Sequence, residues 1–247
     1  MSKLKELCKK LRIGNLENLI TEIEFEDPEQ YLTDILSLEV EKRKSRRVKR
    51  LIKKASFPNI KTLDDYNFEP ITFPDSIDKT DLLTLDFIDR KENILMLGTV
   101  GTGKTHLATA LGLKACNKDK KVKFYRTVDL TNKLLEQHQK GQAGKMIKKI
   151  AKVDLLILDE LGYIPFSKKA AELLFSVISN CYEKQSMIVT SNLQLGRWNE
   201  VFGDDRLTTA LIDRVVHHAH ILAFTGKSYR FQQAMVNKNG KEKQNDN

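Results

Sequence analysis

The stretch from Ile94 to Thr105 reads ILMLGTVGTGKT and decides the fold. Four apolar residues predict a short buried strand, and the G-x-x-x-x-G-K-T pattern after them is typical of a phosphate-binding loop that opens a helix. Its glycines let the backbone N–H groups point inward at phosphate oxygens. Lys104 then reaches the outer phosphates, and the Thr105 hydroxyl can ligate Mg²⁺. A glycine-rich turn alone would not need this Lys-Thr pair. We therefore expect ATP to contact nine consecutive residues: Gly98, Thr99, Val100, Gly101, Thr102, Gly103, Lys104, Thr105 and His106.

Two further polar motifs follow apolar runs. In LLILDE at 155–160, Asp159 can hold Mg²⁺ through its water shell, and Glu160 can polarise a water in line with the γ-phosphate. A later run ends in Thr190-Ser191-Asn192. Asn192 can hydrogen-bond the γ-phosphate or that water if its strand lies between the other two. The structural alternative for each motif is a capped turn at a strand exit.

The 247 residues have room for a main domain and a small extension. Residues 1–56 carry helical patterns, and prolines mark residues 57–92 as a linker and entry to the core. Residues 93–236 alternate apolar runs with helical patterns, which predicts a parallel sheet covered on both faces. The polar end at 237–247 is expected to be disordered. The expected strands are 94–97, 122–125, 155–158, 187–189 and 220–224.

Charge and cysteine content indicate which partners and which cellular compartment suit the protein. Lys and Arg number 42 against 33 Asp and Glu, and this net charge of +9 favours polyanionic partners. Three separated cysteines without Cys-x-x-Cys spacing favour buried thiols in a reducing compartment. No apolar run reaches the ~18 residues that span a bilayer, so we expect a cytoplasmic protein without membrane contact. The histidines, including His106, His217, His218 and His220, lack metal-ligand spacing, which favours packing or solvent roles.

With these motifs in view, residues 57–231 resemble the IstB-type transposition helper ATPases, AAA+ proteins of the initiator and helicase-loader clade. The resemblance implies an α/β fold: a three-layer α/β/α P-loop AAA+ sheet without a C-terminal helical lid, after a small helical N-terminal domain. Thr99 and Val100 depart from the pattern, because many relatives carry two prolines there. The similar stretches are FPNIKTLDDYNF at 57–68, GTVGTGKTHLATALG at 98–112, LLILDELGYIPFSKKAAELLFSVIS at 155–179 and TSNLQLGRWNEVFGDDRLTTALIDRVVHHAH at 190–220.

The same resemblance implies roles for single residues. Asp159 and Glu160 become the Walker B pair, and Asn192 becomes the sensor of the γ-phosphate. ATP would drive assembly of a homo-oligomer on double-stranded DNA, which recruits or activates a partner transposase. In such assemblies a neighbouring subunit supplies an arginine to each site. Arg214 best fits that position and Arg206 is second, the alternative for either being a surface ion pair.

Two basic segments are candidates for contact with DNA phosphates. The N-terminal cluster lacks interleaved aromatics, which suits contact without sequence preference; a solvated helix face or a transposase interface are its alternatives. The second segment lies between the second and third expected strands. In the initiator and helper clade this insertion faces the central channel that holds DNA, so we rank it slightly above the N-terminal cluster as a DNA contact. The chosen residues are Arg46, Arg47, Lys49 and Arg50 in the first segment, and Lys133, Lys145, Lys148, Lys149 and Lys152 in the second.

Three other functions compete with a transposition helper. A loader of the replicative helicase would share the same core motifs, although GYIPFSKKAAELLF and DRVVHHAH favour the helper. A P-loop kinase for a small molecule would need an acceptor pocket and a cationic lid, which the sequence does not assign. A scaffold without hydrolysis would not need Lys104, Thr105 and Glu160 together.

Overall fold

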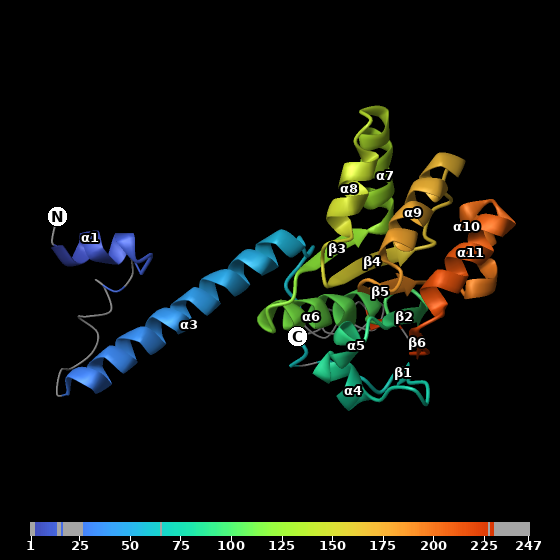
Figure 1. Ribbon diagram of the computed structural model, residues 1–247. Helices are drawn as coiled ribbons and strands as arrows, with labels where there is room; N and C mark the ends of the chain where they lie inside the picture. The colour runs from blue at the N-terminus through green and yellow to red at the C-terminus, as the bar shows by residue number, and fades with distance from the viewer. Residues whose placement is uncertain (1–2, 14–15, 17–26, 65, 227, 230–247) are drawn as a thin grey trace, which may run out of the picture. The chain divides into compact units, whose positions relative to one another are not determined.

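The computed structural model describes residues 3–13, 16, 27–64, 66–226 and 228–229 (Figure 1). It divides into two compact units, residues 1–51 and 52–247. The expected disordered tail and the last residues of the expected core lie outside the described residues. In the first unit α1 spans Lys3–Lys10, and α3, Pro28–Ala55, continues into the second. The pair Asp27-Pro28 is a typical helix start, and the Asp27 carboxylate caps α3 by accepting from the Gln30 N–H at 2.8 Å.

A six-stranded sheet with the order β1-β6-β2-β5-β4-β3 forms the core of the second unit. All neighbouring strands are parallel except the β1–β6 pair. The five strands expected from the sequence are confirmed, within one to three residues at their ends. In the part of the chain that the structure describes, the two-residue edge strand β1 is the one additional strand. The strands span Ile71–Thr72 (β1), Asn93–Gly98 (β2), Val122–Arg126 (β3), Leu155–Leu161 (β4), Ser186–Ser191 (β5) and Ala219–Phe224 (β6).

Helices cover both faces of the sheet, so the expected three layers are present (Figure 1). Helix α6, Lys104–Asn117, lies on one face, and α9, Lys168–Cys181, packs on the other between α7 and α11. The apolar residues Ala170, Leu174, Val177, Ile178 and Cys181 of α9 recur at helical spacing and form its buried face. The remaining helices on that face are α7 (Thr127–Gln139), α8 (Ala143–Ile150), α10 (Asn199–Phe202) and α11 (Asp205–Val216), with a 3₁₀ turn at Leu195–Arg197. Among the described helices, none is both long and apolar enough to cross a membrane.

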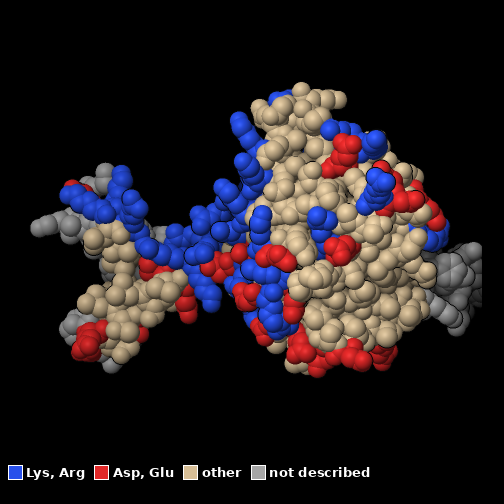
Figure 2. Space-filling model, turned by 45° about the vertical axis from the view of Figure 1, so that its right-hand side comes forward, with Lys and Arg blue, Asp and Glu red and all other residues tan. Residues whose placement is uncertain are grey.

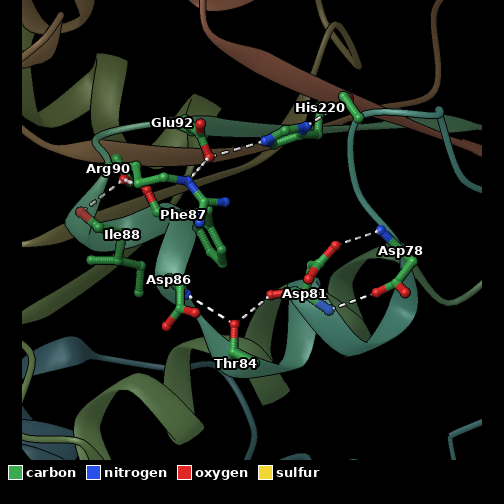
Figure 3. Close-up of polar contacts among 11 residues, drawn as sticks. Asp78, Asp81, Thr84, Asp86, Phe87, Ile88, Arg90, Glu92 and His220 are labelled. Carbon is green, nitrogen blue, oxygen red and sulfur yellow. Dashed lines mark hydrogen bonds and ion pairs between the residues drawn. The ribbon is translucent and has the colours of Figure 1, made fainter.

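The expected linker contains two short helices, α4 (Lys79–Thr84) and α5 (Asp86–Asp89). Asp78 and Asp81 form a reciprocal capping box at the start of α4 (Figure 3). The sequence hides this signal because the box ends in Asp rather than the usual Glu or Gln. Beyond α5, the carboxylate of Glu92 accepts from Arg90 at 2.8 Å and lies 3.1 Å from Nε2 of His220 (Figure 3). This contact ties the start of β2 to β6.

Candidate nucleotide-binding site

The phosphate loop has the strand, turn and helix context that its sequence predicts. The loop follows β2 and ends at Gly103, which has a φ of 97° and directly precedes the first turn of α6. None of its three glycines, Gly98, Gly101 and Gly103, has room for a side chain. A Cβ on Gly98 would lie 2.3 Å from the carbonyl oxygen of Phe224, and one on Gly103 would lie 2.9 Å from the Tyr66 hydroxyl. The loop therefore depends on glycine for close approach as well as for its backbone angles.

Lys104 lies in the pocket with its side chain folded over the loop. Its Nζ donates to the carbonyl oxygens of Gly98 at 2.6 Å and Thr99 at 2.7 Å. The residue is 8% exposed, so its charge is held in place by loop dipoles rather than by bulk water. The ammonium group is thus kept within the loop that would receive the phosphates.

Thr105 and Asp159 face each other, as the Mg²⁺ interpretation requires. The Thr105 hydroxyl lies 2.9 Å and 3.1 Å from the two carboxylate oxygens of Asp159. Burial raises the pKa of Asp159 above its ordinary value, while hydrogen bonds from Thr190 and Thr105 act in the opposite direction. Hydroxyl and carboxylate oxygens are the ligands Mg²⁺ prefers, and a buried carboxylate held mainly by neutral hydroxyls favours an added cation. The residues present therefore fit the metal.

A β-bulge places Glu160 at the mouth of the pocket. Leu158 pairs with Val189 and Leu161 with Ser191, so Asp159 and Glu160 together oppose Thr190 alone. Glu160 has a φ of 58°, a left-handed conformation that costs a residue with a side chain roughly 1–2 kcal/mol. The bulge lets the Asp159 side chain turn inward while Glu160 lines the pocket.

Asn192 lies where the sequence interpretation requires it. Strand β5 runs between β2, which carries the phosphate loop, and β4, which carries Asp159. Asn192 follows β5 and lines the same pocket. Among the residues that the structure describes, its buried Oδ1 finds no hydrogen-bond partner. An unpartnered buried amide oxygen beside the phosphate loop suits contact with a bound ligand or water.

The pocket has a volume of about 590 Å³, within the range of small-molecule sites. It contains nine of the predicted site residues and also groups that the sequence motifs missed. Tyr66 donates to the Gly103 carbonyl at 3.2 Å and packs edge-on against His106, and the Tyr229 N–H donates to the Gly101 carbonyl at 2.9 Å. Tyr66 belongs to the FPNIKTLDDYNF stretch, but no motif assigned it to the site, and Tyr229 had no signal beyond its aromatic side chain. The predicted residues that line the pocket are Val100, Gly101, Thr102, Gly103, Lys104, Thr105, His106, Glu160 and Asn192, joined by Thr190.

Neither candidate arginine lies in this pocket. Arg214 is on α11, where its Nη1 donates to the Ala210 carbonyl at 2.8 Å and its guanidinium lies 4.9 Å from the Phe175 ring centre. Arg206 is exposed on the same helix. Both border a shallow hollow on the surface of α11. They are therefore available to a site other than that of their own chain.

The basic segments are exposed helix surfaces. Helices α7 and α8 lie side by side, and the turn between them contains Gly141 (Figure 1). All five lysines chosen there are exposed, and so are the four cations chosen on α3. Figure 2 shows blue Lys and Arg atoms crowded over the helical N-terminal part of the chain. Burial lowers the pKa of Lys123, and the neighbouring charges of Lys133 and Lys149 lower it further.

The fold changes one expectation about the histidines. Sequence spacing gave them no carboxylate companion, but Glu183 lies beside His217 and His218, with one ligand atom of each within 4.8 Å of the others. All three are exposed, and His217 Nδ1 lies 2.8 Å from the Tyr182 hydroxyl. His106 and His220 contact protein groups, in keeping with packing roles. Cys8, Cys116 and Cys181 are buried thiols in helices, as expected.

Relatives of this chain are ATP-binding proteins of insertion sequences. It is 39% identical over 217 residues to one from IS5376 of Geobacillus stearothermophilus, with 88% of this chain and 85% of that protein covered. It is 37% identical to one from IS21 of Pseudomonas aeruginosa, covering 83% and 77%. These names describe the relatives.

Solved structures agree on the fold. The DnaC helicase loader superposes with a TM-score of 0.52 at 23% identity, covering 66% of this chain and 96% of that one. AMPPCP-bound DnaA from Aquifex aeolicus gives 0.52 at 22%, covering 76% and 56%. At this identity the likeness establishes the AAA+ fold alone. The family model for IstB-like ATP binding proteins matches residues 17–237, so this chain, with its complete phosphate loop and acidic pair, belongs to that ATP-binding AAA+ family.

Proposed function

We propose that this protein is a Mg²⁺-dependent ATPase that assembles into a homo-oligomer on double-stranded DNA and recruits or activates a partner transposase. One observation carries the proposal. The pocket gathers Lys104, Thr105, Glu160 and Asn192 around the phosphate loop, while Arg206 and Arg214 lie outside it. A site with a water-activating acid but an arginine on another surface suits hydrolysis completed by a second copy.

The residues of this chain divide the work of hydrolysis. Lys104 and the loop N–H groups bind and orient the phosphates. Thr105 and Asp159 would hold Mg²⁺, which neutralises charge on the transferred phosphoryl group. Glu160 orients the attacking water and accepts its proton. The Asn192 amide fixes the position of that water or of the γ-phosphate.

Exposed apolar side chains around the pocket support assembly. Val100, Tyr163 and Tyr229 are 54%, 62% and 43% exposed, and all three line the nucleotide pocket. Large apolar groups on a rim are costly to leave in water and mark surfaces that another protein covers. A second copy that covers this rim would bring its α11 arginines toward the phosphates.

The lysines of α7 and α8 support contact with DNA. Ile147 and Ile150 are buried on α8, which leaves Lys145, Lys148 and Lys149 to solvent. Burial lowers the pKa of Lys123 first, and the neighbouring cations Lys133 and Lys149 lower it further. Such a surface attracts phosphates without reading sequence. We place DNA there first and on the cationic face of α3 second.

The insertion-sequence names of the relatives support a transposase as client, and a cytoplasmic location is part of the same proposal. A pull-down should retain a transposase encoded with this chain. Binding to the replicative helicase instead would replace the helper function with helicase loading.

The ATPase rate against protein concentration, with and without duplex DNA, tests the proposal. Cooperative assembly predicts that the rate per chain rises with both. Glu160→Gln should bind ATP and lose about 10²–10⁴-fold in turnover, because the amide cannot accept the proton of water. This variant should form large ATP-dependent assemblies on DNA in sizing experiments. Glu172→Gln, at a half-buried carboxylate on α9 that pairs with Lys169, is the matched control.

The contrary results are equally specific. A rate that is independent of concentration and DNA, from a monomer, would reject assembly and favour a small-molecule kinase. Equal turnover for Glu160→Gln and the unchanged protein would reject the role of Glu160.

A further inference from the structure

Thr190 on β5 contacts both acidic residues of the site. Its hydroxyl donates to Oδ1 of Asp159 at 2.6 Å and accepts from the backbone N–H of Glu160 at 2.9 Å. The residue is 1% exposed, so water does not compete for these bonds. One buried hydroxyl therefore joins the proposed metal ligand to the proposed water-activating residue.

The bulge explains why this position matters. Asp159 and Glu160 oppose Thr190 alone, so the regular ladder between β4 and β5 is interrupted at the residues that carry the chemistry. Glu160 holds its left-handed backbone there, and the Thr190 hydroxyl satisfies its N–H. A bound N–H in a rarely populated backbone conformation fixes the direction in which the side chain leaves the strand.

The remaining contacts give the network a direction. Because the Glu160 N–H can only donate, the Thr190 hydroxyl oxygen accepts that hydrogen bond. The hydroxyl hydrogen is then donated to the Asp159 carboxylate. Thr105 reaches the same carboxylate, and the Thr127 hydroxyl donates to the Asp159 carbonyl at 2.9 Å. Asp159 is thus held from three sides, whereas among the described contacts the Glu160 turn has Thr190 as its side-chain partner.

We propose that Thr190 is a positioning residue for ATP hydrolysis: its hydroxyl holds Glu160 in the turn that directs its carboxylate into the nucleotide pocket, and it orients Asp159 toward Thr105. This rests on the ATPase activity proposed above. The role needs a hydroxyl and not merely a residue of this shape, which separates it from core packing.

Three variants test the hydroxyl. Thr190→Val keeps the shape and removes both hydrogen bonds, and Thr190→Ser keeps the hydroxyl and removes a methyl group. Thr131→Val is the matched control, because Thr131 is also 2% exposed and hydrogen-bonded, but to the Val128 carbonyl within α7. Thr190→Ala replaces the valine variant if that protein does not fold.

Turnover and nucleotide affinity are measured separately. Thr190→Val should lower kcat about 10–100-fold, because a displaced catalytic group loses its alignment. Its affinity for a fluorescent ATP analogue should stay within about threefold, since Lys104 and the loop are unchanged. Thr190→Ser should recover most of the lost turnover, and Thr131→Val should match the unchanged protein.

A second readout does not depend on activity. Hydrogen exchange of the Glu160 amide, followed by NMR in the nucleotide-free chain, should be about tenfold faster in Thr190→Val and near normal in Thr190→Ser. Unchanged kcat, or equal loss in the serine and valine variants, overturns the proposal. Absence of turnover in the unchanged protein and in Thr131→Val overturns the ATPase function and this inference with it. Normal turnover in those two proteins and in Thr190→Val overturns the inference alone.

Discussion

Two hydrogen-bonded carboxylates at opposite ends of the sheet have opposite electrostatics. Glu92 precedes β2, and its pKa is lowered: burial alone would raise it, but hydrogen bonds from His220 and Arg90 outweigh burial. Asp159 lies near the end of β4, and its pKa is raised, because burial outweighs the hydrogen bonds from Thr190 and Thr105. The first carboxylate has a guanidinium partner and the second has neutral hydroxyls.

This difference distinguishes a structural contact from a site prepared for a ligand. The Arg90 guanidinium compensates the charge of Glu92, and His220 is hydrogen-bonded to the same carboxylate, so the loop before β2 is joined to β6 (Figure 3). At Asp159 the hydroxyls of Thr190 and Thr105 offset burial only in part, so an added cation would compensate the carboxylate charge. The comparison predicts that changes near Asp159 act on turnover, and changes near Glu92 act on stability.

Arg214→Ala should show the largest effect. If α11 of one copy completes the site of another, turnover should fall by on the order of 10³-fold while ATP binding is kept. Arg206→Ala is the matched variant on the same helix, and it should lower turnover only slightly. Mixing Arg214→Ala with Glu160→Gln should restore activity, because hybrid interfaces join an intact Glu160 to an intact Arg214. Full activity of Arg214→Ala would transfer the role to Arg206.

Asp159→Asn should act on turnover next most strongly. We expect a loss of at least about 100-fold in Mg²⁺-dependent hydrolysis, because an amide is a poor ligand and no longer balances the metal charge. The nucleotide-free variant should be as stable as the unchanged protein or more so, since a poorly compensated buried charge is removed. ATPase assays and urea unfolding test the two parts. Marked destabilisation would show that Asp159 is a structural carboxylate like Glu92.

The sheet was predictable because each of its main strands is a run of apolar residues followed by a turn. Asp159 and Asn192 were predictable for the same reason: carboxyl ends of parallel strands share one edge, and β5 does lie between β2 and β4. The N-terminal cap at Asp27 followed from a local Asp-Pro pattern. Local and periodic signals were therefore sufficient for the core and for the main site residues.

The features of the site that the sequence did not predict depend on contacts between segments that are distant in the sequence. Thr190 belongs to a quoted motif, but its role depends on a bulge in β4, and no pattern in LLILDE announces a left-handed Glu160. Tyr66 lies 37 residues before the glycine whose carbonyl it contacts. Glu183 joins His217 only through the packing of two helix ends. Such pairings have no spacing rule in one sequence.

Glu92→Gln should have a smaller effect, and it should act on stability. Losing charge-assisted hydrogen bonds from Arg90 and His220 should cost about 1 kcal/mol of unfolding free energy at neutral pH, with some screening because Glu92 is 26% exposed. Turnover at a temperature where the variant is folded should be unchanged. Glu69→Gln, exposed in the preceding loop, is the control for loss of a surface carboxylate. A stability equal to that of the control would show that solvent screens this contact fully.

The pH dependence of these two variants gives the smallest and most discriminating effect. A lowered folded-state pKa makes Glu92 stabilising above its ordinary value of 4.5, and that contribution is lost as the pH falls through the folded-state pKa. A raised folded-state pKa makes ionised Asp159 destabilising at neutral pH, and the penalty disappears as the pH falls through that pKa. In urea unfolding of nucleotide-free protein at pH 7 and pH 4, Glu92→Gln should be the less stable and Asp159→Asn the more stable at pH 7. Both differences from the unchanged protein should shrink at pH 4. Differences of the same sign at pH 7 would contradict the contrast between the two carboxylates.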